Sequence, residues 1–281
     1  VEFEGDPAVS KLAVDSALVL EPPELSFATR PGGTRTTVLK LRNASEDSVR
    51  VQADVATPPT LTGVALGELR GPELSAAGML SVRPGQFTIR AGATQNVVVV
   101  ARMPRAGDDT PLHPNHYGLL KLNCSYPDGQ SAGTTRALVH VQNASVESQA
   151  RAQVPEMNLT LKDGLEYIVE AEAANVGNVH FEPRCRAALQ TARGQAVLKT
   201  ELGGRQERML PLEVRQFAGV MDFSEVEPGR YILVVTMQTG TDGTDGQKKL
   251  VMEVKETEDG RIVEVIDGKT AAAGEGEKER P

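Results

Sequence analysis

The stretch Tyr117-Gly-Leu-Leu-Lys-Leu-Asn-Cys124 is followed by the turn Pro127-Asp-Gly129 and by Arg136-Ala-Leu-Val-His-Val141. The arrangement returns as Tyr231-Ile-Leu-Val-Val-Thr-Met237, a Gly/Thr/Asp loop at 240–246, and Lys249-Leu-Val-Met-Glu-Val254. In each copy a tyrosine opens an apolar strand, and a glycine-containing turn leads to a second apolar strand, which is the pattern of a β-hairpin. The tyrosines are 231 − 117 = 114 residues apart. A repeat at this distance predicts two copies of one domain type.

The two copies differ in how their apolar residues alternate. In the second copy Tyr231 shares a strand face with Leu233 and Val235, whereas in the first copy Tyr117 alternates out of step with Leu120 and Leu122. Because a shift of one residue moves a strand's side chains to the other face, we expect a bulge or bend at Gly118 that returns the strand to inward packing.

Composition limits the classes of protein to which the chain can belong. Its 281 residues suit two domains of ordinary size, and 40% of them are apolar, with no Trp and only 4% aromatic. Cores built from Val, Leu, Ile and Ala favour sheet packing. The formal net charge of −8, without a basic cluster, argues against nucleic-acid binding. No apolar run approaches the length of a transmembrane helix.

The two ends and the cysteines give further expectations. The sequence starts at Val1 rather than Met, which suggests an extracytoplasmic protein, periplasmic or at the cell surface, after removal of a signal peptide. Cys124 and Cys185 fall in different predicted domains and form no metal pattern. They are interpreted either as two small buried residues or as an interdomain disulfide.

The first predicted domain covers residues 16–144, after a flexible arm at 1–15. Leu18-Val-Leu-Glu-Pro-Pro-Glu-Leu-Ser-Phe27 is a strand pattern interrupted by a proline pair, which indicates an edge or a switch between sheets. Alternating segments follow at 36–42 and 49–55, and two strands at 80–90 and 95–101 are joined by Ala91-Gly92. With the hairpin these make about seven strands, the pattern of an antiparallel sandwich.

Residues 57–80 interrupt this regularity with many Pro and Gly residues, and they are predicted to form an insertion with a short strand near 64–69. Long loops in compact domains are often functional. The insertion is therefore the first hypothesis for a partner-binding surface, which would use Thr57, Leu61, Val64, Leu66 and Leu69.

The run Val97-Val98-Val99-Val100 is a second hypothesis for partner binding. Its continuous apolar character is typical of a central strand buried on both faces, or of an edge strand that awaits a partner, because it carries none of the charges that protect edges.

The second predicted domain covers residues 154–267, after a polar linker at 145–153. Its strand patterns lie at 157–161, 167–173, 186–189 and 196–202, with a further apolar segment Met209-Leu-Pro-Leu-Glu-Val214 before the repeated hairpin. Asn43 and Asn175 occupy matching places after a second strand. Asp259-Gly260 predicts one extra hairpin strand. Residues 268–281 contain no large apolar side chain and are predicted to be a disordered tail.

These motifs carry a family resemblance. Residues 18–27, the strand ending at Asn43, and Val82-Arg-Pro-Gly-Gln-Phe-Thr-Ile-Arg-Ala-Gly-Ala-Thr-Gln95 resemble the immunoglobulin-like N-terminal domain of the PapD-like superfamily. The second domain is similar to bacterial surface immunoglobulin-like modules through Asn175-Val-Gly-Asn178 and Pro228-Gly-Arg-Tyr231. The resemblance implies an all-β protein with two antiparallel immunoglobulin-like sandwiches in tandem, of PapD-like or fibronectin-III-like type.

The sequence also departs from these families. The Cys–Cys bridge and Trp of antibody domains are absent. Pilus chaperones of the PapD type use an Arg and a Lys in the interdomain cleft to hold a subunit's C-terminal carboxylate, and Arg35 and Lys121 are the positional counterparts. The acidic-aromatic motif of those chaperones is replaced by His113-Pro-Asn-His-Tyr-Gly118.

Few residues suggest chemistry. His113 and His116 would need a third ligand to hold a metal. The acidic loop at 240–246 has oxygen ligands for calcium, but a hairpin loop uses Gly and Asp for its own turns. No nucleophile elbow, phosphate loop or zinc-protease motif occurs. The sequence therefore predicts no enzyme, no cofactor and no metal site.

Two functional hypotheses remain. The first is a non-catalytic extracytoplasmic module for protein binding, structure or adhesion, whose domain loops and sheet edges contact another protein or a surface assembly. The alternative is a PapD-like periplasmic chaperone that holds a pilus or surface subunit by donating a strand, with residues 95–101 as the donor.

Overall fold

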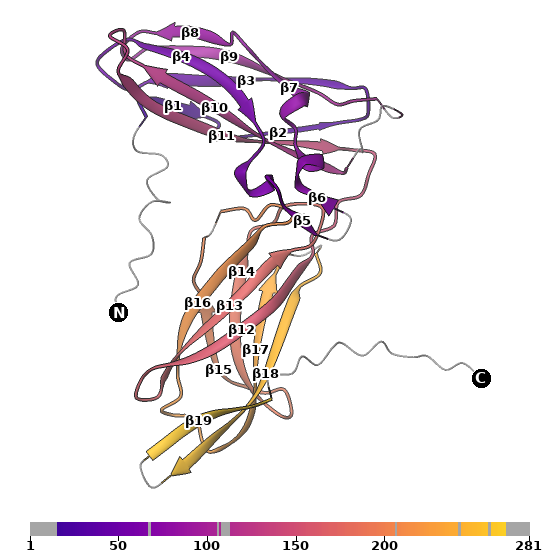
Figure 1. Cartoon of the computed structure of the whole chain (residues 1–281), viewed down its shortest axis with the longest axis vertical. Helices are drawn as coiled ribbons and strands as arrows, with labels where there is room; N and C mark the ends of the chain where they lie inside the picture. The colour runs from indigo at the N-terminus through magenta and orange to yellow at the C-terminus, as the bar shows by residue number, and fades with distance from the viewer. Residues whose placement is uncertain are drawn as a thin grey trace, which may run out of the picture. The chain divides into compact units, whose positions relative to one another are not determined.

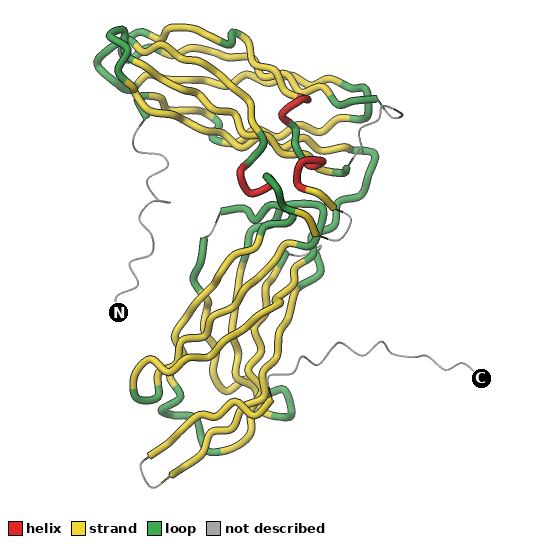
Figure 2. Tube along the Cα trace, viewed as in Figure 1, coloured by secondary structure: helices red, strands yellow, loops and turns green. Residues whose placement is uncertain are grey.

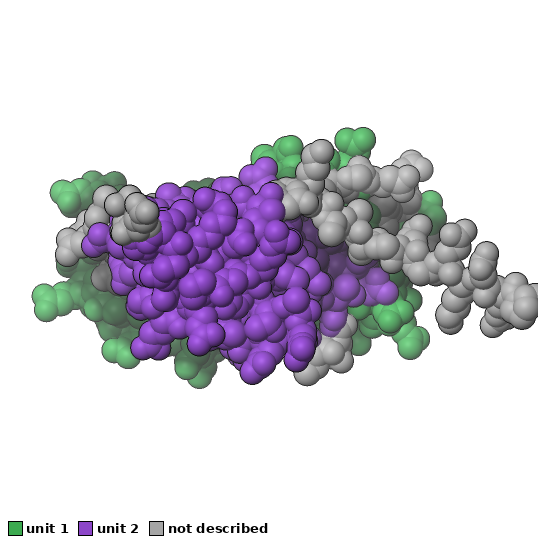
Figure 3. Space-filling view, turned by 90° about the horizontal axis from the view of Figure 1, so that it is seen from below, with its two compact units in different colours: residues 1–148 green, residues 149–281 purple. Residues whose placement is uncertain are grey.

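The structure is a computed structural model that describes residues 16–66, 69–105, 107, 113–205, 207–240, 243–257 and 260–267. The expected arm at 1–15 and the expected tail at 268–281 lie outside the described residues. The chain forms two compact units, residues 1–148 and 149–281, which Figure 3 colours separately. The division falls inside residues 145–153, which the sequence predicts as a linker, and the first strand of unit 2 already begins at Ala152.

The described part of unit 1 is all β apart from three short 3₁₀ turns, which Figure 2 shows in red. Its strands are β1 (Leu18–Glu21), β2 (Glu24–Thr29), β3 (Thr34–Asn43), β4 (Val49–Ala56), β5 (Ala65–Leu66), β6 (Leu69–Arg70), β7 (Leu80–Arg83), β8 (Gln86–Ile89), β9 (Thr94–Arg102), β10 (Asn115–Ser125) and β11 (Ser131–Asn143). The turns are η2 (Pro59–Leu61), η3 (Gly71–Leu74) and η4 (Ala77–Met79).

Two sheets make the sandwich of unit 1, in the orders β1-β3-β9-β7 and β2-β11-β10-β4-β8. The alternation of apolar residues along β3 and β9 places Leu39, Leu41, Val97 and Val99 in the core, all at most 1% exposed. The same period of two operates in β10 and β11, so the inner faces of both sheets bury their branched residues against each other.

Two strand segments switch sheets at prolines. β1 pairs with β3 in one sheet, and after Pro22-Pro23 the chain continues as β2, which pairs in parallel with β11 in the other sheet. The expectation of a switch at this proline pair is confirmed. The predicted single strand at 80–90 is likewise divided at Pro84, because β7 pairs with β9 and β8 pairs with β4. Proline has no N–H to donate, so a ladder ends where it stands.

The expected bulge at Gly118 is wrong. The β10–β11 ladder runs regularly from Asn115 to Asn123, with Tyr117 opposite His140 and Gly118 opposite Val139. Tyr117 is nevertheless fully buried, although it lies on the face opposite Leu120 and Leu122. Tyr117 is buried because the segment 57–80 packs on the outer face of β10 and covers its side chain.

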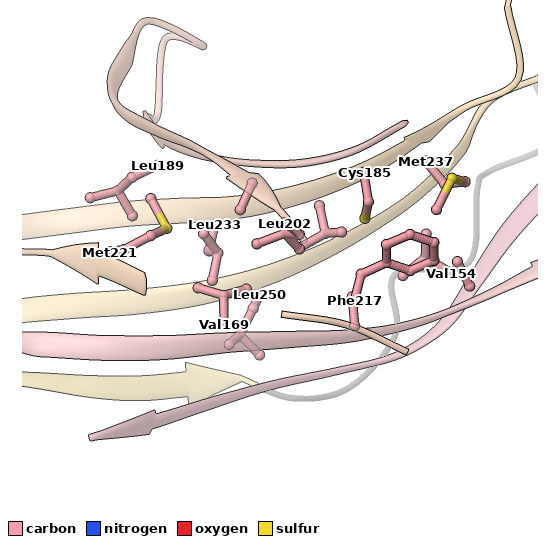
Figure 4. Packing of buried hydrophobic residues seen from close by; sticks show 14 of the residues in the cluster. Val154, Val169, Cys185, Leu189, Leu202, Phe217, Met221, Leu233, Met237 and Leu250 are labelled. Carbon is pink, nitrogen blue, oxygen red and sulfur yellow. The ribbon is translucent and has the colours of Figure 1, made fainter. Parts of the chain in front are cut away.

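Unit 2 is a second sandwich. Its strands are β12 (Ala152–Asp163), β13 (Glu166–Asn175), β14 (Arg184–Thr191), β15 (Ala196–Leu202), β16 (Val214–Asp222), β17 (Gly229–Gln238), β18 (Gly246–Thr257) and β19 (Gly260–Asp267), as labelled in Figure 1. The sheets have the orders β12-β13-β16 and β15-β14-β17-β18-β19. Side chains such as Val169 and Phe217 from one sheet meet Leu233 and Met237 from the other (Figure 4).

The described parts of both units are thus immunoglobulin-like sandwiches, whose named strand pairs are antiparallel except for the parallel pair β2–β11. The repeated stretch forms the equivalent hairpin in each, β10–β11 and β17–β18. The extra strand expected after Asp259-Gly260 is present as β19. Tyr231 closes the corner before β17, because its hydroxyl donates a 2.9 Å hydrogen bond to the Glu227 carbonyl. This is the tyrosine corner of immunoglobulin-like folds. No helix in the described residues is long and apolar enough to cross a membrane.

A buried asparagine ends one long strand of each unit, β3 in unit 1 and β13 in unit 2. The Nδ2 of Asn43 donates to the carbonyls of Asp47, Ile89 and Arg90, at 2.7, 3.2 and 3.2 Å. The Nδ2 of Asn175 donates to the carbonyls of Val179 and Met209, both at 2.9 Å, and its Oδ1 accepts from the N–H of Gly177. Both side chains are 0% exposed. Each asparagine therefore satisfies backbone groups of two loops that meet at one end of the sandwich.

Replacing Asn175 with alanine is expected to destabilise unit 2 by about 2 kcal/mol, because the carbonyls of Val179 and Met209 and the N–H of Gly177 each lose a hydrogen bond in a buried corner. Calorimetric unfolding of the full chain measures the effect. The matched control is Asn158→Ala on β12, where the side chain is exposed and little change is expected. Equal melting behaviour of the two variants would contradict the proposed role of Asn175.

The segment Met209-Leu-Pro-Leu-Glu213 is a buried loop rather than a strand, and the strand begins only at Val214. Leu212 has a positive φ of 68°. The loop is held by Glu213, whose Oε2 accepts from the Leu210 N–H at 2.9 Å and whose Oε1 lies 2.7 Å from the Nε of Arg215. Arg215 in turn donates to the carbonyls of Arg205, Glu207 and Arg208. The buried Glu213–Arg215 ion pair and its hydrogen bonds therefore hold this loop in place of strand pairing.

Candidate protein-binding surface

The insertion at 57–80 is a folded substructure with a buried base. Leu61 in η2 and Leu74 in η3 are 0% exposed, and neither belongs to the main core of unit 1. The base joins β10 through the N–H of Ala76, which donates to the Tyr117 carbonyl at 2.8 Å. Ala76 and Met79 belong to the main core. The insertion is therefore fixed at its base to the sheet.

Gly71 explains how closely the base packs. A Cβ at this position would lie 1.9 Å from the Leu61 carbonyl oxygen, so only glycine allows η3 to approach η2. The Gly71 N–H also donates to the Val64 carbonyl at 2.8 Å. This contact closes the segment between residues 64 and 71, where β5 and β6 pair as a short hairpin, Leu66 opposite Leu69.

The five insertion residues predicted to contact a partner divide into two groups. Leu61 is buried, and the hydroxyl of Thr57 lies 2.7 Å from that of Ser75, so both belong to the base. Val64 and Leu69 are half-buried beside the exposed Ala65, and Leu66 lies with them in the hairpin. Among the five predicted contact residues, those that remain accessible, Val64 and Leu69, therefore lie at the β5–β6 hairpin.

The apolar run of β9 is enclosed by neighbouring strands. Val98, Val99 and Val100 pair with β3 on one side and with β7 on the other. Val97 and Val99 point into the core, and Val98 and Val100 are half-buried. A partner strand could pair with this part of β9 only if β7 left the sheet. The role predicted for these four valines stays a prediction.

Arg35 and Lys121 lie in different sheets of unit 1. Arg35 is exposed on β3, and its Nε donates to the Ala28 carbonyl at 3.2 Å. Lys121 lies on β10, opposite Asp54 of β4 and Arg136 of β11. The sandwich does not place the two cations on one face. Their use as carboxylate-binding residues stays a prediction.

A row of polar side chains crosses the start of β10, and the sequence did not point to it. His140 Nε2 and Asn115 Oδ1 are 2.7 Å apart, and Asn115 Nδ2 donates to Ser148 Oγ at 2.9 Å. The His140 ring stacks on Tyr117, with 5.3 Å between ring centroids. Asn115 is fully buried and His140 nearly so. The row ties the end of unit 1 to its sheet, because Ser148 is the last residue of the unit.

His113 and His116 lie beside Glu73 of η3. The two imidazole centroids are 6.0 Å apart, and His113 Nε2 lies 3.4 Å from a Glu73 oxygen. His116 is fully buried, and neither of its ring nitrogens makes a hydrogen bond of standard geometry, although backbone groups of Glu73 and His113 lie close enough to favour its charged form. Burial, followed by the proximity of His113, lowers the pKa of His116 to about 4. In the described residues, no three His, Cys, Asp or Glu side chains converge as metal ligands.

The remaining sites of interest have structural roles. Asp245 Oδ1 accepts hydrogen bonds from the N–H and the hydroxyl of Thr239, so this carboxylate of the acidic loop organises the loop itself. Cys124 and Cys185 are free, buried thiols in separate units. Burial raises the pKa of both thiols, that of Cys185 to about 12, and both therefore remain protonated and unreactive at neutral pH.

No protein-family model and no curated protein matches the chain. Several solved structures are similar to it. The CupB2 chaperone of Pseudomonas aeruginosa is 13% identical with a TM-score of 0.40, over 82% of this chain and 98% of that chain. The E. coli chaperone DraB is 12% identical with a TM-score of 0.39, over 83% and 96%. A PapD-like domain of human CEP192 is 16% identical with a TM-score of 0.34, over 47% and 89%.

At these identities the likeness concerns the fold. The two immunoglobulin-like units follow from the strand orders themselves.

Proposed function

We propose that the chain is a non-catalytic, extracytoplasmic protein-binding module, and that the β5–β6 hairpin of the insertion carries its main partner contact. The observation that supports the proposal is the contrast within the insertion. Leu61 and Leu74 are fully buried, whereas Val64, just before β5, and Leu69, in β6, remain partly accessible. A hairpin held on a fixed base loses little conformational entropy when a partner binds, which favours affinity. The partner would be another protein or a subunit of a surface or pilus assembly.

The test changes the hairpin and leaves its base intact. Removing all of residues 57–80 is unsuitable, because Ala76 and Met79 are part of the core of unit 1. Instead, the double variant Val64→Asp/Leu69→Asp is compared with Val38→Asp, which places the same charge on another accessible valine, 51% exposed on β3.

Tagged full-length proteins are used to recover partners from the native cell envelope, and the affinity for each recovered protein is then measured. A partner that binds the wild type and Val38→Asp, but binds the hairpin variant at least about tenfold more weakly, supports the proposal, because such a loss is about 1.4 kcal/mol. Equal binding by all three proteins would remove the hairpin from the function.

A second candidate function is a chaperone of PapD-like type that holds a subunit by strand pairing. The observation that favours it is the position of β2, the last strand of its sheet, which pairs only with β11 in the described part of unit 1. Its six residues contain no proline. Strand pairing at β2 requires no strand to leave the sheet, only release of the Ala28 carbonyl by Arg35, whereas pairing at β9 requires β7 to leave.

Co-expression with small subunits encoded near its gene distinguishes the two functions. Under the chaperone function, the chain purifies with such a subunit, and Ser26→Pro on β2 reduces the yield of complex while the Val64→Asp/Leu69→Asp variant does not. Purification without a subunit argues against the chaperone function.

A further inference from the structure

β19 forms an edge of the five-stranded sheet of unit 2 and carries exposed branched side chains. β19 is the last strand in the order β15-β14-β17-β18-β19 and pairs only with β18 among the described residues, as Figure 1 shows at the end of unit 2. Ile262, Val265 and Ile266 are 39%, 48% and 45% exposed. Three accessible branched side chains in five residues at a free edge are a template for pairing with another strand.

The other edges of unit 2 are better protected. β12 contains Pro155 and two shifts in its pairing with β13, at 153–156 and 161–163. β15 and β16 approach each other through paired hydrogen bonds between Gly203 and Ala218, 2.7 and 2.9 Å long. β19 has no proline, and its one pairing shift lies at its end, beyond the pair Met252–Val265. Its regular part therefore remains available.

The sequence of β19 is complementary to itself in the antiparallel direction. When Glu264 is placed opposite Glu264 of a second strand, Val263 lies opposite Val265 within the regular part of β19, and Ile262 is directed towards Ile266, which lies at the pairing shift. Directly opposed branched residues stabilise antiparallel pairs. In this register apolar residues face apolar residues on both sides of Glu264. A strand that binds an unrelated partner has no need of such a symmetric sequence, so the symmetry favours a second copy of the chain as the partner.

The charge at the centre of this register is already compensated within each chain. Glu264 Oε2 lies 2.5 Å from Nζ of Lys255, which is also 3.5 Å from Glu253. Two copies would bring two such Lys–Glu pairs together rather than two bare carboxylates, so the repulsion expected between like charges in opposed positions is reduced. Arg261 is anchored away from the edge by the carbonyls of Ser224 and Val226, each at 2.8 Å.

From these observations we infer that β19 binds a second copy of this chain, edge to edge and antiparallel, with the two-fold axis at Glu264. The contact joins the two five-stranded sheets into one continuous sheet. A symmetric pair of this kind uses the same surface on both subunits. This inference goes beyond the proposed function, because it concerns unit 2, and it stands or falls independently of the hairpin in unit 1.

The experiment combines association with a test of register. Sedimentation equilibrium of the full chain is expected to show a monomer–dimer equilibrium, and Val265→Lys is expected to weaken dimerisation at least about tenfold, through the loss of apolar contact and a new charge on each strand. Val197→Lys on β15, where the valine is 45% exposed, is the matched control and should dimerise as the wild type does. A monomer at millimolar concentration would overturn the inference.

The register is tested with cysteines, since the native thiols are buried. Under mild oxidation, Glu264→Cys should form a disulfide-linked dimer by itself. Val263→Cys and Val265→Cys should cross-link more efficiently when mixed with each other than either does alone. Efficient self-linking of Val263→Cys, with no gain on mixing, would show a different contact and contradict the proposed axis. Calorimetry of each variant confirms that unit 2 is folded.

Discussion

Replacing Arg215 with methionine is expected to lower the free energy of unfolding of unit 2 by about 4 kcal/mol, because removal of one partner from a buried ion pair leaves the other charge unpaired. The side chains of Arg215 and Glu213 are only 7% and 10% exposed. The substitution also removes the donors to three carbonyls of residues 205–208. Urea denaturation of the full chain, or calorimetry if the variant is already partly unfolded, measures the loss.

The control for this prediction is Arg186→Met. Arg186 lies 2.6 Å from Glu201, but these side chains are 50% and 68% exposed, so solvent screens the pair. We expect a change below about 1 kcal/mol. If the two variants lost similar stability, the buried pair would not be the element that holds the 209–213 loop.

Acidification from pH 6.5 to pH 4 is expected to destabilise unit 1 by about 3 kcal/mol through His116 alone, since its pKa falls from 6.5 to about 4 on folding. The folded state keeps the imidazole neutral. Above pH 6.5 neither state binds the proton, and stability is unaffected. As the pH falls below 6.5 the unfolded chain binds the proton first, so stability is lost until the folded state is also protonated near pH 4.

The variant His116→Leu tests this directly. At neutral pH the variant should keep the stability of the wild type, because a buried imidazole without a hydrogen bond of standard geometry is replaced by an apolar side chain. On acidification it should lose much less free energy of unfolding than the wild type does. His180→Leu is the comparison, because burial and Arg208 also lower the pKa of His180 to about 4, but in unit 2. Calorimetric scans at several pH values give the slopes. An unchanged acid dependence in His116→Leu would contradict the assignment.

The repeated hairpin could be predicted from the sequence because each strand carries its own apolar alternation and turn residues. The sheet switch at Pro22-Pro23 was also predictable, since proline cannot continue a ladder. The buried loop at 209–213 was not. Its apolar residues have the composition of a strand. The groups that hold it as a loop act through contacts with the backbone, because Glu213 accepts from the Leu210 N–H and Arg215 donates to the Glu207 carbonyl.

The burial of individual residues in the candidate site also depends on tertiary contacts, which the local sequence pattern does not contain. Residues 57–80 were recognisable as an insertion from their Gly and Pro content. The sequence could not tell that Leu61 is buried while Val64 is accessible, because that difference depends on the approach of Gly71 to Leu61. The valine run of β9 was predicted to be either central or at an edge, and only the pairing with β7 decides between these positions.

The buried asparagines restrict the choice of host for producing the protein. Asn43-Ala-Ser45 and Asn143-Ala-Ser145 have the sequence that oligosaccharyltransferases modify. In the folded protein both asparagines are at most 1% exposed, and the Nδ2 of Asn43 is used for three carbonyls. A glycan attached to Asn43 during secretion would occupy that nitrogen and prevent the corner from closing. Secretion from a eukaryotic host should therefore yield misfolded glycoprotein, whereas a bacterial host without this modification should yield folded chain.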